Sequence, residues 1–221
     1  ISPGRNAPLI PVMSLSLMFS TFLPFRAAAS KAREGPNSIR KESFAMSETF
    51  HSLDDFRKVL AAQPGVDAEA FAAAQDHNGQ LTKPPGALGR LEDLAFWYRG
   101  WRGGENTQIS APQIIVLAGN HGVAARGVSA FPAEVTEQMV MNFQHGGAAI
   151  NQIALSVGAS LDVVALDLDQ PTADFTSAPA MDEAGFLAAL HAGWDQVNTD
   201  ADLLVVGEMG IANTTSAAAL A

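Results

Sequence analysis

The stretch QIIVLAG at residues 113–119 decides the fold class of this chain. Its five consecutive aliphatic residues follow a glutamine and run up to a glycine, a pattern typical of a strand buried on both faces of a parallel sheet. Two later stretches, LDVVALD at 161–167 and LLVVG at 203–207, have the same character. Helical segments separate the three strands. This alternation predicts an α/β fold with a parallel sheet covered by helices on both faces.

Apolar residues at helical spacing, bounded by Gly and Pro, predict six helices. They cover residues 53–62, 67–75, 88–102, 132–145, 148–157 and 186–197. Ser52 and Asp67 suit the caps of the first two, because their side-chain oxygens can accept a hydrogen bond from a backbone N–H of the first turn. Asn78-Gly79 is expected to open a loop, since this dipeptide favours a turn.

Composition excludes several classes of function. The chain has 221 residues, enough for one sizeable domain with a core. It has no cysteine, which excludes disulfides, thiolate chemistry and cysteine-ligated zinc. Its formal net charge of -10 argues against nucleic acid or an anionic membrane surface as a partner. No uncharged stretch is continuously apolar over the roughly 20 residues that a membrane-spanning helix needs.

Positive charge is confined to the first part of the chain. Residues 1–45 hold six of the 13 basic residues and two of the 23 acidic ones. From Met46 onward, every Lys and Arg lies at or before Arg126. An anion bound by the second half must therefore be held by backbone N–H groups or by cations from elsewhere.

The first 45 residues are left out of the fold prediction. The chain begins with Ile1, and PLIPVMSLSLMFSTFLPFRAAAS has the composition of a secretory signal. Pro11, Pro24 and Arg26 are unusual in such a signal, whereas Met46 begins an ordinary protein N-terminus. We interpret residues 1–45 as a translated upstream region or a mispredicted start. A working signal peptide, and with it a secreted binding protein, is the alternative.

Ligands of parallel α/β sheets bind beyond the carboxyl ends of the strands. The loop after the first strand, AGNHGVAARGVSAFPAEVTEQMV, places Asn120 and His121 at the mouth of the strand. Ser129 and Gln138 are predicted to face the crevice, while Glu134 belongs equally well to a solvated helix face. His121 could ligate a metal, but no histidine spacing supports this, and a hydrogen-bonded structural histidine is favoured. Asp167, after the second strand, could hold a ribose hydroxyl or cap a turn.

The loop after the third strand, GEMGIANTT, is suited to bind a phosphate. Gly207 and Gly210 allow the backbone to expose N–H groups, and Asn213 and Thr214 supply donors at a helix start. This combination cradles a phosphate without a cation. A carboxylate beside a bound phosphate weakens its binding, so Glu208 is expected to have a different role. It could accept or relay a proton in the crevice, or it could cap local N–H groups.

Three motifs together resemble the nicotinate-nucleotide–dimethylbenzimidazole phosphoribosyltransferase family. They are LTKPPGALGRLEDLA, AGNHGVAARGVSAFPAEVTEQMV with NFQHGGAAIN, and GEMGIANTTSAAAL, which follow in the family's order between about Leu53 and Ala221. The resemblance implies a Rossmann-like large domain, part of a small helical domain, a homodimer and a cytoplasmic location. It also implies a pentosyltransferase without metal or cofactor. Its substrates would be nicotinate mononucleotide and 5,6-dimethylbenzimidazole, and its products α-ribazole 5′-phosphate, for the lower ligand of cobalamin, and nicotinate.

The resemblance also assigns roles to residues of this chain. The base would be bound by Ser129, Phe131 and Gln138. The phosphate and ribose would be bound by Gly207, Gly210, Asn213 and Thr214. Glu208 would be an auxiliary catalytic carboxylate beside the benzimidazole, while the family's principal base, a glutamate, would lie beyond Ala221. The family usually has GEMGIGNTT, so Ala212 is a departure that would be strained by about 1 kcal/mol if its φ is positive.

These expectations divide the chain into a leader at 1–45, a helical segment at 46–105 and an incomplete Rossmann-like domain at 106–221. The chain would be a fragment truncated at its C-terminus and inactive alone. Apolar faces near Val163 and Val205 would be uncovered, which predicts aggregation or partial folding. Two alternatives stay open: a transferase for another aromatic base, such as a phenol, adenine or another benzimidazole, and a non-catalytic base- or nucleotide-binding protein.

Overall fold

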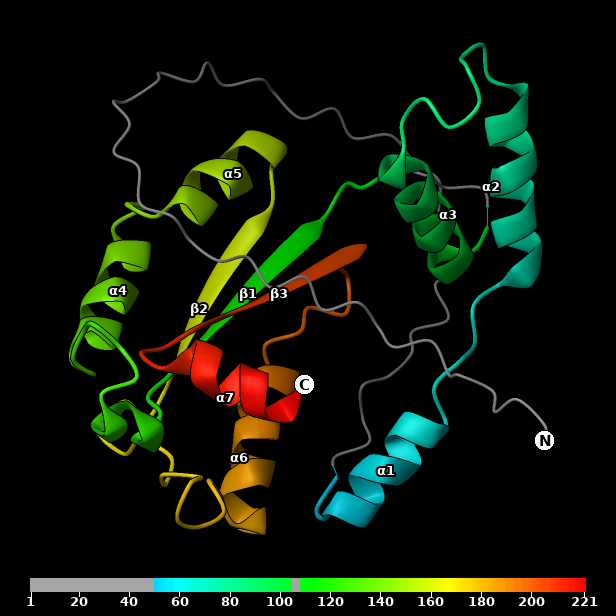
Figure 1. Ribbon diagram of the computed structural model, residues 1–221. Coiled ribbons are helices and arrows are strands. Elements are labelled where there is room, and N and C mark those ends of the chain that lie inside the picture. Colours follow the sequence, from blue (N-terminus) through cyan, green and yellow to red (C-terminus); the bar gives the residue numbers. More distant parts are fainter. Residues whose placement is uncertain (1–49, 105–107) are drawn as a thin grey trace. The chain divides into compact units, whose positions relative to one another are not determined.

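The computed structural model describes residues 50–104 and 108–221, which form two compact units (Figure 1). One comprises the described part of Glu48–Ser110, and the other is Ala111–Ala221. The leader predicted at residues 1–45 lies outside the described residues. Within the described ranges, no helix combines the length and the apolarity needed to cross a bilayer.

The first unit consists of three helices, α1 Leu53–Ala61, α2 Ala68–Gln80 and α3 Arg90–Arg102. The predicted caps are confirmed, because Ser52 Oγ accepts from Asp55 N at 3.1 Å and Asp67 Oδ1 accepts from Ala70 N at 2.9 Å. The helices α2 and α3 pack together through Phe71 and Phe96, whose ring centroids lie 6.1 Å apart.

The loop predicted at Asn78-Gly79 was wrong, since α2 continues through both residues to Gln80. The Asn78 side chain donates to Glu92 Oε2 of α3 at 3.0 Å. This tertiary contact fixes the last turn of α2 and offsets the cost of a helical glycine, which is about 1 kcal/mol.

Glu92 organises the connection between α2 and α3. Its side chain is only 10% exposed and forms an ion pair with Lys83 Nζ at 2.8 Å. It also accepts from Asn78 Nδ2 and, at 3.0 Å, from the backbone N–H of Leu88. These bonds lower the pKa of Glu92 to about 2, and the bond from Lys83 has the largest effect. The carboxylate thereby pins a loop that is rich in Gly and Pro.

This network predicts an acid-sensitive helical unit. A carboxyl whose pKa is lowered by folding stabilises the folded state above its unfolded pKa of 4.5, and that contribution is lost as the pH falls toward about 2. We expect the thermal midpoint of the unit to fall over that window, followed by fluorescence of Trp97 and Trp101. Glu92→Gln should flatten this pH dependence and lower the midpoint at pH 7. Glu69→Gln, at an exposed position of α2, should do neither. An unchanged pH profile for Glu92→Gln would contradict the assignment.

The second unit is built on a three-stranded parallel sheet in the order β2-β1-β3 (Figure 1). The strands are β1 Pro112–Gly119, β2 Ser160–Leu166 and β3 Leu203–Met209. The predicted α/β class is confirmed. One boundary differs: β3 pairs with β1 as far as Met209, so Glu208 lies within the strand and not in the turn after it.

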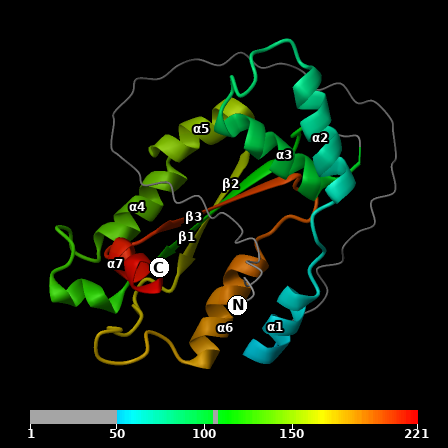
Figure 2. The same ribbon diagram turned by 45° about the vertical axis from the view of Figure 1, so that its right-hand side comes forward.

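Helices cover both faces of the sheet (Figure 2). On one face lie α4 Val135–Gln144 and α5 Ala149–Val157, and on the other lies α6 Glu183–Trp194. The 3₁₀ helix η1 Gly122–Arg126 and the helix α7 Asn213–Leu220 follow β1 and β3 at the carboxyl edge of the sheet. Ile114 and Val116 of β1 form a core cluster with Phe143 of α4 and with α5. Leu117, on the opposite face of the strand, lies against Gly193 of α6. Side chains of β1 therefore alternate between two helical layers.

The helix boundaries differ from prediction by a few residues. The helix α4 begins at Val135 and not at Pro132, and α6 begins at Glu183, where Asp182 Oδ1 accepts from Gly185 N at 2.8 Å. The burial of the strands agrees with prediction in part. The core of β1 is buried, as predicted, and Val205 of β3, predicted to be uncovered, is 39% exposed. Val163 of β2, predicted to be uncovered, packs against the core cluster.

Candidate functional site

The loops that follow the three strands are joined at the carboxyl edge of the sheet. Asn120, the residue after β1, is 9% exposed, and its Nδ2 donates to Leu168 O at 2.9 Å. Its backbone carbonyl accepts from Thr172 N at 3.1 Å. These bonds tie the loop after β1 to the loop after β2. Asn120 Oδ1 is buried and accepts no hydrogen bond from the described residues.

Arg126, at the end of η1, reinforces this connection. Its Nε lies 2.6 Å from Asp174 Oδ2, and its Nη2 donates to Ser177 Oγ at 2.9 Å. The Thr176 hydroxyl and then the Arg126 guanidinium lower the pKa of Asp174. Arg126 is the only Lys or Arg in Ala111–Ala221, and it is engaged by acceptors of the neighbouring loop.

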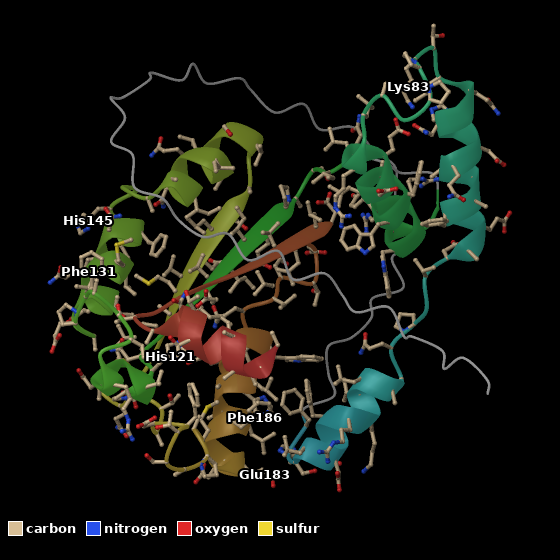
Figure 3. All side chains as sticks on the ribbon, viewed as in Figure 1. Lys83, His121, Phe131, His145, Glu183 and Phe186 are labelled. Carbon is tan, nitrogen blue, oxygen red and sulfur yellow. The ribbon has the colours of Figure 1, made fainter. Side chains whose placement is uncertain are left out.

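The loop after β3 is attached to the loop after β1 by side-chain hydrogen bonds. Ile211 N donates to Thr136 Oγ1 of α4 at 3.1 Å, and Thr136 is completely buried. His121 Nδ1 lies 3.0 Å from Ser216 Oγ of α7. Figure 3 shows His121 below α7, at the end of the sheet. The segments 120–138 and 207–216, both predicted to bind ligand, are thus brought together.

Gly210 lies where only glycine fits. A Cβ atom there would lie 2.0 Å from Gly119 O and 3.2 Å from His121 Nε2. The backbone after β3 therefore crosses directly over the end of β1. The role predicted for Gly210, to let the chain turn at this point, has a steric basis.

Glu208 and Asn213 form a hydrogen-bonded pair. Asn213 Nδ2 donates to Glu208 Oε1 at 2.7 Å, and Asn213 Oδ1 accepts from Thr214 N at 2.8 Å. Glu208 is paired with Leu117 in the strand register, so its side chain projects on the α6 side of the sheet, where it is exposed. Among the described residues it accepts from a side-chain amide and from no backbone N–H, so it does not act as the cap that was the alternative for this residue.

His121 is half-buried at this edge of the sheet. Burial lowers its pKa below the usual value of 6.5, and the Glu208 carboxylate opposes the shift. Its bond to Ser216 fits the structural role favoured for it. In the described part of the chain, no group of three or more His, Cys, Asp or Glu side chains could hold a metal ion.

The residues predicted to bind the base lie on the segment that enters α4. Ser129 Oγ accepts from Phe131 N at 3.2 Å, and Phe131 is 62% exposed (Figure 3). Gln138 is exposed on α4. Within the described residues, no hydrogen bond joins Ser129 or Gln138 to Glu208, so their shared role stays a prediction.

Asp167, the residue after β2, is exposed and has a φ of 35°. It caps the next turn only through its backbone carbonyl, which accepts from Gln170 N at 2.9 Å.

The start of α7 leaves backbone donors available. Ala212, the N-cap residue, has a φ of 69° and no side-chain oxygen to accept from the first turn. The N–H groups of Ala212 and Thr215 have no acceptor among the described residues. Unpaired N–H groups at a helix N-terminus favour an anion.

Ala212 is therefore predicted to be a strained residue. A left-handed conformation costs a non-glycine residue roughly 1–2 kcal/mol, and part of this is offset because glycine loses more entropy on folding. Ala212→Gly should raise the free energy of unfolding by about 0.5 kcal/mol. Ala217→Gly, inside α7, should instead lower it by up to about 1 kcal/mol. Urea denaturation measures both, and a loss of stability in Ala212→Gly would show that the residue is not strained.

Comparison with known proteins identifies the family. A family model described as phosphoribosyltransferase matches residues 63–221. This chain belongs to that family. Two similar relatives are both named nicotinate-nucleotide–dimethylbenzimidazole phosphoribosyltransferase. The one from Roseobacter denitrificans is 66% identical over 176 residues, which cover 80% of this chain and 52% of the relative. The one from Ruegeria pomeroyi is 69% identical over 169 residues, which cover 76% and 50%.

A solved phosphoribosyltransferase of the same name, from Thermus thermophilus, shares the fold. It is 40% identical with a TM-score of 0.63, and the match covers 70% of this chain and 52% of that structure. The Rossmann-like parallel α/β architecture is thus confirmed. The chain spans about half the length of the relatives it matches.

Several residues at the carboxyl edge of the sheet were not predicted to matter for the site. Thr136, Ser216 and Asp174 join the loops, yet the motifs drew attention to their neighbours. Thr136 lies two residues before Gln138 and carries a hydroxyl on the apolar side of its helix. A hydroxyl at such a position requires an acceptor or donor inside the protein, and this signal could have identified it.

Proposed function

We propose that this chain contributes the Rossmann-like part of an enzyme that transfers the 5-phosphoribosyl group from nicotinate mononucleotide to 5,6-dimethylbenzimidazole. The products are α-ribazole 5′-phosphate and nicotinate, as in assembly of the lower ligand of cobalamin. The observation that carries the proposal is the 66% identity to a relative of that name. The convergence of the loops after β1 and β3 through Thr136 and His121 supports it.

In this reaction a ring nitrogen of the benzimidazole attacks C1′ of the ribose. The bond between C1′ and the pyridine nitrogen breaks, and nicotinate leaves with the bonding electrons. Attack from the opposite side converts a β-nucleotide into an α-nucleotide. The proton on the second benzimidazole nitrogen must then pass to a base. Nicotinate leaves from a cationic pyridinium, so the reaction we propose uses no metal and no cofactor.

The proposed roles divide between the loop after β3 and the segment that enters α4. Gly207, Gly210, Asn213 and Thr214 are proposed to bind the phosphate and ribose. The unpaired N–H groups of Ala212 and Thr215 at the start of α7 support an anion site there. The base is bound by Ser129, Phe131 and Gln138. We also propose that the enzyme is a homodimer in the cytoplasm.

Glu208 is proposed as an auxiliary carboxylate. Asn213 holds one of its oxygens at 2.7 Å, which leaves the other free to polarise the benzimidazole N–H. A fixed negative charge also favours a transition state in which the ribose carries positive charge. Removal of such a group costs about 100-fold in rate, the lower end of the range for acid–base catalysis.

The test uses the 221-residue chain with both substrates. Calorimetry measures binding of each substrate, and chromatography measures release of nicotinate. We expect binding of nicotinate mononucleotide and dimethylbenzimidazole. If turnover is present, Glu208→Gln should lower it about 100-fold, while Glu137→Gln, at an exposed position of α4, should leave it unchanged. Binding without turnover fits the Rossmann-like part of the enzyme taken alone, since the chain spans half of its relatives, and it fits the second function, a base- and nucleotide-binding protein. Absence of any binding would contradict both.

A further inference from the structure

Thr136 is the most enclosed polar residue of the described chain. It is 0% exposed and lies in the first turn of α4, which begins at Val135. Its Oγ1 accepts from Ile211 N at 3.1 Å, a contact between residues 75 positions apart. No other hydrogen bond among the described residues links α4 to the loop after β3.

The partner of Thr136 lies in the middle of the loop proposed to bind phosphate. Ile211 and Ala212 are 9% and 7% exposed. An Ile211 N–H without Thr136 Oγ1 would be buried with no acceptor, and a buried unpaired N–H is costly. The neighbouring Gly210 touches the end of β1, so the loop is fixed at two adjacent residues, by a steric contact at one and a hydrogen bond at the next.

We propose that Thr136 is a positioning residue for the phosphate loop, and that its hydroxyl holds Ile211 so that the following N–H groups face the 5-phosphate of the nucleotide. This inference rests on the function proposed above. Thr136 touches no substrate in this scheme and acts through the backbone of Ile211. Its effect should therefore be confined to ligands that carry the phosphate.

The conformation of the loop supports such a role. Ala212 adopts a left-handed backbone that is unfavourable for alanine, and strained conformations persist only where neighbouring contacts hold them. The Thr136 bond is made by the residue directly before Ala212. It is thus placed to oppose relaxation of Ala212 into another conformation, which would turn the unpaired N–H groups of Ala212 and Thr215 away from the ligand.

The first test compares two ligands that differ in the phosphate alone. Calorimetry measures the Kd of nicotinate mononucleotide and of nicotinate riboside for the full chain. Thr136→Val keeps the shape of the side chain and removes the acceptor. It should raise the Kd of the mononucleotide about tenfold, a change of about 1.4 kcal/mol, and change that of the riboside less than twofold. Thr136→Ser, which retains the hydroxyl, should restore binding, and Thr199→Val, at an exposed position, should have no effect.

The second test needs no ligand. The N–H groups of Ile211, Asn213 and Thr214 are hydrogen-bonded. Their amide hydrogen exchange should become at least tenfold faster in Thr136→Val than in the unmodified chain or in Thr136→Ser, while exchange in β1 is unchanged. Equal exchange in all three proteins would overturn the positioning role whatever the binding data show. Equal weakening of mononucleotide and riboside would overturn its link to the phosphate. Failure of the unmodified chain to bind the mononucleotide, with the exchange difference present, would instead refute the proposed function.

Discussion

Gly210→Ala is expected to lower the free energy of unfolding of the α/β unit by about 3 kcal/mol or more, because its methyl group has no room. The added carbon would lie 2.0 Å from Gly119 O, a backbone atom at the end of β1. Relief requires the loop after β3 to move away from the sheet. That movement would pull Ile211 from Thr136 and should also weaken binding of nicotinate mononucleotide.

Gly207→Ala provides a matched control within the same motif. A Cβ atom at Gly207 would lie 3.5 Å from Val116 Cγ2 and 3.9 Å from Ile115 O, which is ordinary packing distance. We expect its free energy of unfolding to stay within about 1 kcal/mol of the unmodified chain. Urea denaturation followed by far-UV circular dichroism measures both variants. Equal losses would show that the close approach of Gly210 to Gly119 does not determine stability.

Phe143→Ala is expected to cost about 3–5 kcal/mol, the usual range for truncating a buried phenylalanine. Phe143 is 3% exposed and belongs to the core cluster with Ile114 and Val116. Since domains are stable by only about 5–15 kcal/mol, the variant should be partly unfolded at 37 °C. The measurement is again urea denaturation at 25 °C.

Phe131→Ala separates binding from folding. Phe131 precedes α4 and is 62% exposed, so its truncation should change stability by less than about 0.5 kcal/mol. If it forms part of the base site, the Kd for dimethylbenzimidazole should rise about tenfold, which corresponds to 1.4 kcal/mol. Unchanged affinity with unchanged stability would remove Phe131 from the proposed site.

The core strand was predictable because its signal is local. Five aliphatic residues in a row favour burial on both faces, and β1 is the central strand. The end of β3 was not predictable in this way. Glycine at 207 suggested a turn, but pairing with Leu117 and Ala118 of β1 extends the strand to Met209. Strand pairing, which the local sequence does not display, decided where Glu208 lies.

The candidate site was predicted in its loops but not in its connections. Glycines and polar residues after each strand indicated the edge where ligands bind. The bonds from Thr136 to Ile211 and from His121 to Ser216 join residues 75 and 95 positions apart. No periodicity in the sequence reveals such pairs, because they depend on how helices pack on the sheet. For the same reason, the local sequence at Asn78-Gly79 indicated a turn, whereas the contact of Asn78 with Glu92 keeps both residues in α2.

The engagement of Arg126 has a consequence for how an anionic nucleotide reaches the sheet. Ala111–Ala221 contains twelve acidic residues and one arginine, and that arginine is occupied by Asp174. A nucleotide bound as we propose would then approach this unit against a repulsive field and be held by neutral peptide dipoles. Added salt screens this repulsion. It does not weaken the proposed binding, because no ion pair between protein and ligand is involved. In this unit, higher ionic strength should speed association, the reverse of its effect on enzymes that grip phosphate with lysine or arginine.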